Sequence, residues 1–297
     1  MKDIKTLIQI KNHEGGVNIM GKTSNEYCEK QYFRFQKVDD YFADFTSWDK
    51  VVKASGCSFK KGEWKLTLHL ESAEGKKGDM LFEVFNGGSF RFRFHPDKKA
   101  EGYSDYNTRA IVQDEFEETQ KFTAEDDLKA EFKEVKGKYV EMTIRANPED
   151  GELIVHADYD PFVLTLYKVD AGDNNDKYVV FHAAEGSLRF KPAGGMDDYH
   201  IAWMVKKPCT AKYVGFGEQG GLELVKNNTR VTYFNYDNMR YRQVYGKGPL
   251  EEREPLYHSD PFFMEVNGEP ERDFVYGIFV DNPSETVLDM GYYRSDS

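Results

Sequence analysis

The feature that most constrains the fold is the alternation of apolar and polar residues along much of the chain. In residues 64–70 (WKLTLHL) the apolar side chains occupy the even positions, and in residues 90–95 (FRFRFH) three phenylalanines share one face. Alternation with a period of two is typical of β-strands that bury one face. The aromatic content of 15% agrees, because aromatic residues favour strands and bury large areas.

The same pattern predicts many short strands separated by turns. Further candidates are residues 32–35, 80–85, 140–145, 153–157, 162–167, 178–182, 187–190, 200–205, 230–234, 262–266 and 275–280. The segments NGG at 86–88 and DYDP at 158–161 are predicted turns. Many strands at short spacing, without repeated βα units, indicate an all-β fold: a large antiparallel sandwich with at most one or two short helices.

One helix is expected between the strands. Thr123 and Asp126 resemble a capping box, and Leu128, Phe132 and Val135 follow at helical spacing. No repeat or low-complexity linker interrupts the chain, so residues 1–297 are predicted to form a single domain. Residues 1–50 show the least clear pattern.

Charge and cysteine content exclude several classes of function. The formal net charge is -12, which argues against binding nucleic acid or an anionic membrane. No segment is long and apolar enough to span a bilayer. Residues 1–16 show no secretory signal, and the three cysteines lie far apart, so we expect free thiols and a cytoplasmic location.

Motifs for cofactors, metals and catalysis are weak. Residues 215–220 (GFGEQG) match G-x-G-x-x-G, but the alternating residues after them favour a bend between strands over a dinucleotide site. No G-x-S-x-G elbow and no clustered metal ligands occur, so we predict no catalytic residue, cofactor or metal. His69, His95 and His156 occupy polar strand positions and are expected to be solvated.

Residues 234–263 mix aromatic rings with carboxylates, amides and guanidinium groups. Flat apolar rings beside planar polar groups suit a sugar, which has apolar faces and a rim of hydroxyls. The same composition also occurs in ordinary polar loops, so it does not identify a ligand alone.

Four segments resemble glycoside hydrolase family 31 in the expected order. They are YVGFGE at 213–218, FNYD at 234–237, LYHSDPFF at 256–263 and YGIFVDN at 276–282. They are similar to segments of the N-terminal galactose-mutarotase-like sandwich of that family. Residues 107–114 and 234–263 look like the α-1,4-glucan lyase branch, particularly its fungal type.

The resemblance implies an enzyme acting on α-1,4-glucans or maltooligosaccharides through a covalent glucosyl intermediate, as a lyase or an α-glucosidase. Its catalytic aspartates lie on a (β/α)8 barrel that follows the sandwich. Because the sequence stops at Ser297, we expect a sandwich that is inactive alone. Its barrel-facing surface would then be apolar and prone to self-association.

The resemblance also implies a substrate loop, an insertion at residues 235–260. Asp237 matches the loop aspartate that hydrogen-bonds the glucosyl residue, with Asn238, Met239, Tyr241 and Arg242 as expected neighbours. Asp237 as a simple turn residue is the alternative. Two other functions stay open: a stand-alone α-glucan-binding module and a mutarotase-like enzyme.

Overall fold

The computed structural model describes residues 5–6, 47–59, 65–84, 90–105, 129–147, 151–171, 177–194, 198–207, 210–220, 223–234, 258–269, 272–282 and 284–291. Within these residues helical structure is confined to one short 3-10 helix, η3 (Ala100–Asp105), and a 3-10 position at Ser47. No helix of these residues is long and apolar enough to cross a membrane. The strands pair antiparallel. The prediction of an all-β antiparallel fold is therefore confirmed.

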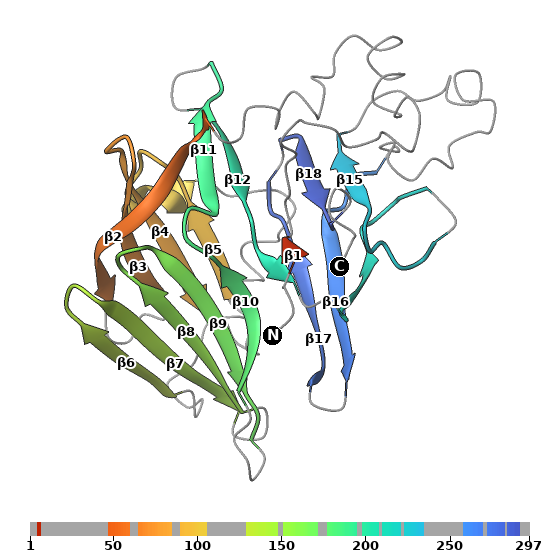
Figure 1. Ribbon diagram of the computed structural model, residues 1–297, viewed down its shortest axis with the longest axis horizontal. Helices are drawn as coiled ribbons and strands as arrows, with labels where there is room; N and C mark the ends of the chain where they lie inside the picture. Colours follow the sequence, from red (N-terminus) through yellow and green to blue (C-terminus); the bar gives the residue numbers. More distant parts are fainter. Residues whose placement is uncertain are drawn as a thin grey trace. The chain divides into compact units, whose positions relative to one another are not determined.

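The chain divides into two compact units (Figure 1). The central unit comprises Trp48–Val205, and the flanking unit comprises Met1–Ser47 together with Lys206–Ser297. The single domain expected over residues 1–297 stays a prediction.

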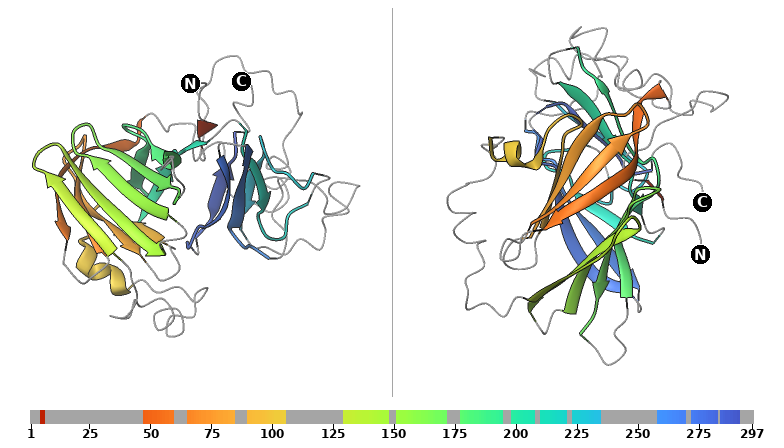
Figure 2. Two further views of the ribbon diagram at one scale, coloured as in Figure 1. Left: turned by 90° about the horizontal axis from the view of Figure 1, so that it is seen from below. Right: turned by 90° about the vertical axis from the view of Figure 1, so that its left-hand side faces the viewer.

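The central unit is built from two sheets that form two layers (Figure 2). The six-stranded sheet has the order β12-β11-β2-β3-β4-β5, and the five-stranded sheet has the order β10-β9-β8-β7-β6. In chain order the strands are β2 (Asp49–Phe59), β3 (Lys65–Ser72), β4 (Lys77–Val84), β5 (Phe90–Phe94), β6 (Lys129–Val135), β7 (Tyr139–Asn147), β8 (Gly151–Asp158), β9 (Val163–Val169), β10 (Lys177–Ala183), β11 (Leu188–Pro192) and β12 (Tyr199–Trp203).

The apolar side chains of the alternating segments form the core between these two sheets. On β3, Leu66 and Leu68 are completely buried, whereas Thr67 and His69 lie on the opposite face. On β7, Val140 and Met142 are completely buried in the same hydrophobic cluster. Burial of a large aliphatic side chain contributes about 1.5 to 3 kcal/mol, so one inward face on each sheet holds the sandwich together.

The flanking unit contains three small sheets. Its strands are β1 (Lys5–Thr6), β13 (Lys206–Lys207), β14 (Lys212–Gly215), β15 (Arg230–Tyr233), β16 (Phe262–Glu269), β17 (Arg272–Phe279) and β18 (Thr286–Asp289). The sheets have the orders β14-β16-β17, β15-β18 and β1-β13. Buried residues of the first two sheets form one cluster that includes Tyr213, Phe216, Val231, Phe263 and Leu288.

The predicted helix is wrong where the structure describes it. Residues 129–135 form strand β6, and Phe132 pairs with Met142 of β7. The Phe132 ring stacks on Phe59 with centroids 4.6 Å apart. Leu128 and Phe132 are four residues apart, a spacing that fits one face of a strand as well as a helix. Pairing with a neighbouring strand therefore overrode a weak local signal. Residues 123–128 lie outside the described residues.

Candidate functional site

The five residues predicted to contact sugar fall within residues 235–257, outside the described part of the chain. They are Asp237, Asn238, Met239, Tyr241 and Arg242. The structure does describe the residues on both sides of this segment. The candidate site is therefore built from the anchors of the loop, and the positions of the five side chains stay a prediction.

The chain enters the segment from strand β15. This strand pairs with β18, and Tyr233 lies opposite Thr286 at the end of the pair. Tyr233 is buried, and its hydroxyl donates a hydrogen bond to the carbonyl oxygen of Phe216 at 3.3 Å. The entry point is thus tied to residues 215–218, the bend that follows β14.

The chain leaves the segment against the same bend. The backbone N–H of His258 donates to the Glu218 carboxylate at 2.8 Å. Four residues later, the carbonyl oxygen of Phe262 accepts a hydrogen bond from the Phe216 N–H at 2.7 Å. One short bend therefore holds both ends of residues 235–257.

The bend needs an unusual backbone. Gly215, Phe216 and Gly217 all have positive φ angles, of 105°, 71° and 67°. A Cβ atom on Gly217 would lie 2.7 Å from the carbonyl oxygen of Asp260, closer than real Cβ atoms approach. Glycine thus provides both the conformation and the space for the returning chain.

Phe216 is the strained residue of the bend, because bulky side chains rarely adopt positive φ. Its ring is completely buried and stacks on Phe263, with centroids 4.8 Å apart and planes at 2°. Packing therefore fixes a conformation that the isolated residue would avoid. Such strain is characteristic of positions where geometry matters for function.

Acidic residues lie at both anchors. Glu218 belongs to the bend, Asp260 packs against Gly217, and Glu285 immediately precedes Thr286, the partner of Tyr233. Burial raises the pKa of Glu285 to about 7. Burial, followed by the charge of Asp260, raises the pKa of the Tyr233 hydroxyl.

The interpretation of GFGEQG as a bend is supported, and a dinucleotide site is excluded here. The described residues 223–234 contain turns and strand β15, and no helix follows the glycines. Glu218 is exposed, whereas the amide oxygen of Gln219 is buried.

Strands β16 and β17 expose an apolar face. Phe262 pairs with Phe279, and Val266 pairs with Val275, so these side chains share one side of the sheet with Met264. Four of them, Phe262, Met264, Val275 and Phe279, are between 37% and 56% exposed. We call these four residues the β16–β17 apolar face.

The three histidines expected to be solvated are partly exposed, and His69 and His156 also contact neighbouring side chains. His69 contacts Asp79 and Ser58, and His156 contacts two carboxylates, those of Glu141 and Asp158. Neighbouring strands supply these partners, which sequence spacing cannot reveal. Among the described residues no group of His, Cys, Asp and Glu could hold a metal ion.

Comparison with protein families connects this geometry to a known domain. Residues 79–289 match the model of the glycosyl hydrolase 31 N-terminal galactose mutarotase-like domain. The chain belongs to this family. The match runs from β4 to β18 and includes the bend and both anchors of residues 235–257. A search of curated proteins with this chain found no match.

Proposed function

We propose that this family 31 domain contributes residues 235–257 to the sugar site of an α-glucan-active enzyme. The observation that carries the proposal is the GFGE bend, which fixes both ends of that segment through Phe216, Gly217 and Glu218. A segment closed at its base by three separate contacts can present side chains at a defined position. Pre-positioning of this kind lowers the entropic cost of binding.

Within the segment, Asp237 is the proposed principal contact. A carboxylate accepts short, strong hydrogen bonds from sugar hydroxyls. Asn238, Met239, Tyr241 and Arg242 would line the same side of the sugar. We assign no catalytic role to these residues, because the family's catalytic aspartates belong to the barrel of the full enzyme.

The β16–β17 apolar face supports a role within a larger assembly. Four exposed large apolar side chains on one sheet face form a surface suited to another protein surface. We propose that this face receives the catalytic barrel. When the barrel is not present, the face is proposed to promote self-association.

The branch of the family is a finer proposal. The segments at 107–114 and 234–263 resemble α-1,4-glucan lyases, which release 1,5-anhydrofructose, whereas α-glucosidases release glucose. The outcome of the reaction depends on the barrel. The resemblance of these two segments therefore supports membership of the lyase branch. It does not support a particular reaction product.

The test is to incubate the purified chain with maltotetraose and to measure anhydrofructose and glucose by chromatography. The proposal expects neither product above a no-protein control. Release of either product, retained after repeated purification, would contradict the non-catalytic role.

Calorimetric titration separates the stand-alone binding module from the proposed shared site. A shared site predicts binding in the millimolar range or weaker, because one side of the sugar is held by this domain. Micromolar affinity that Asp237→Ala abolishes would support the binding module instead.

A further inference from the structure

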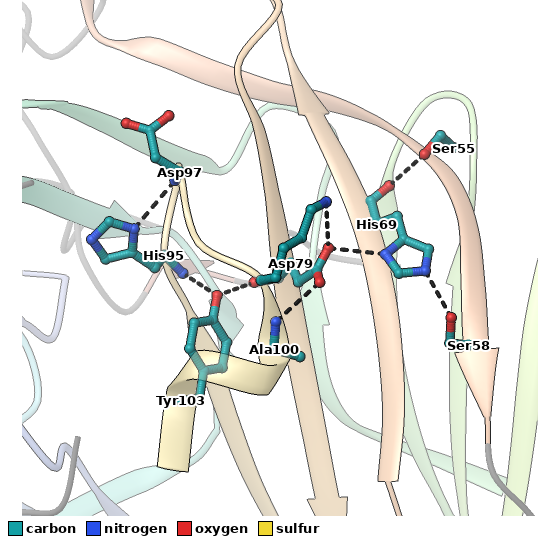
Figure 3. Close-up of polar contacts among 9 residues, drawn as sticks. Ser55, Ser58, His69, Asp79, His95, Asp97, Ala100 and Tyr103 are labelled. Atoms are coloured by element: carbon teal, nitrogen blue, oxygen red, sulfur yellow. Dashed lines mark hydrogen bonds and ion pairs between the residues drawn. The ribbon is translucent and has the colours of Figure 1, made fainter. Parts of the chain in front are cut away.

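A hydroxyl, an imidazole and a carboxylate meet on the outer face of the six-stranded sheet (Figure 3). Ser58 Oγ lies 2.8 Å from His69 Nε2, and His69 Nδ1 lies 2.9 Å from Asp79 Oδ1. The residues come from β2, β3 and β4. His69 pairs directly with Asp79, and its partner on β2 is Gly56, two residues before Ser58.

The carboxylate is buried and surrounded by donors. Asp79 is 3% exposed, and its Oδ2 accepts a hydrogen bond from the Ala100 N–H at 3.0 Å. The Lys99 ammonium lies 3.3 Å from Oδ1, the oxygen that faces His69. Asp79 thus has a hydrogen-bond donor at each carboxylate oxygen.

Helix η3 fixes this carboxylate in place. The hydroxyl of Tyr103, a buried residue of η3, donates to the backbone carbonyl oxygen of Asp79, and the same hydroxyl accepts from the His95 N–H at 2.8 Å. Ala100, which contacts the carboxylate, is the first residue of η3. Asp79 is therefore held at both its side chain and its backbone.

An accepting carboxylate at Nδ1 determines the tautomer of the ring. The Nδ1–H of neutral His69 donates to Asp79, which leaves Nε2 as an acceptor for the Ser58 hydroxyl. Ser58 is exposed, His69 is half-buried and Asp79 is buried, so burial increases from the hydroxyl to the carboxylate. Sites of this kind are recognised by geometry and roles, not by sequence position.

We propose that Ser58, His69 and Asp79 form a nucleophilic acyl-transfer site for esters of small carboxylic acids. Ser58 Oγ bonds to the carbonyl carbon while its proton passes to His69 Nε2. The ester C–O bond then breaks, and the imidazole gives that proton to the departing alcohol. Water attacks the acyl-serine by the same route, which releases the acid and restores the hydroxyl.

The roles differ among the three residues. Ser58 is the nucleophile, His69 is the general base and acid, and Asp79 is a positioning residue that acts through His69. Thr67, the cross-strand partner of Ser58, carries a second hydroxyl that can donate to the negative oxygen. Small activated esters are the first substrates to test, because Ser58 is exposed and they reach it from solvent without needing a pocket.

The site is independent of the proposed sugar-binding role. Its residues belong to the central unit, whereas the GFGE bend belongs to the flanking unit. Failure of either proposal therefore leaves the other intact.

The experiment is labelling with a fluorophosphonate probe, followed by intact mass and peptide mapping. We expect one adduct per chain, on Ser58, and none on Ser58→Ala. Ser55→Ala is the matched control, because Ser55 is also exposed on β2 but donates to the His69 carbonyl oxygen at 3.2 Å. It should label at the wild-type rate.

His69→Gln distinguishes activation from simple exposure. Glutamine retains an amide donor but cannot act as a base, so labelling should slow by about 100-fold or more. Acetylation of Ser58 by p-nitrophenyl acetate should show the same dependence. An adduct on another serine, no adduct, or an unchanged rate in folded His69→Gln would overturn the proposal.

Discussion

At the scale of single residues, the candidate site depends on backbone conformations that few side chains tolerate. Gly217 combines a positive φ with contact against Asp260, and Phe216 keeps its positive φ through stacking on Phe263. Sequence motifs identified the glycines as a bend. They did not reveal that the bend contacts residues some forty positions later, because only the fold brings these segments together.

Gly217→Ala should destabilise the protein by about 1 to 3 kcal/mol, because alanine adds both left-handed strain and a clash with Asp260. Urea denaturation measures the change. Gly137→Ala is the control: its φ is +71°, but nothing lies within 4 Å of the added Cβ. That variant should lose only about 1 kcal/mol. Equal losses in both variants would contradict the close contact at Gly217.

Glu285 predicts a pH dependence of stability. Burial raises its pKa from 4.5 in the unfolded reference to about 7, so folding favours the uncharged carboxyl. This stabilisation is complete below the unfolded pKa and is lost as pH rises through about 7. The melting temperature of Glu285→Gln should therefore exceed that of the wild type above about pH 7, and the difference should vanish in acid. If the melting temperatures of the two proteins differ by the same amount at every pH, the raised pKa of Glu285 is refuted.

At the scale of elements, alternation predicted most strands of the central unit, but in the flanking unit it predicted only β15, β16 and β17 among the described strands. It succeeded for β3 and β7 because each buries one face completely, which imposes a period of two on the sequence. It failed at β6, where a few apolar residues fitted helix and strand equally well. The Ser58–His69–Asp79 cluster could not be predicted, because strand register and not sequence spacing determines which side chains meet.

The hydrogen bond that holds the chain at His258 depends on Glu218. Glu218→Ala removes the acceptor of the His258 N–H, so this amide should exchange its hydrogen faster in a deuterium-exchange experiment. Glu223→Ala is the matched control, because Glu223 is also exposed and lies just after the bend. Unchanged exchange at His258 in Glu218→Ala would show that this contact does not anchor the segment.

At the scale of the whole molecule, two β units each carry a possible function. The flanking unit holds the anchors of residues 235–257, which we propose to contact sugar, and the β16–β17 apolar face. The central unit carries the Ser58 cluster on a sheet whose other face forms the core. The family match, which covers residues 79–289, includes parts of both units.

The apolar face predicts concentration-dependent self-association. In sedimentation velocity, the wild-type chain should sediment faster as concentration rises, and the double variant Val275→Lys with Phe279→Lys should remain monomeric. Leu224→Lys is the control, because Leu224 is 80% exposed but lies outside β16 and β17. Wild-type protein that is monomeric at every concentration would remove the support for this face as an interface.

The central claim is that residues 235–257 contact an α-glucan through Asp237. The most direct measurement is an NMR titration of the isotope-labelled chain with millimolar maltotetraose. The account predicts amide shifts concentrated at residues 237–242, absent in Asp237→Ala. Shifts confined to other strands, or no shifts at any sugar concentration, would contradict it.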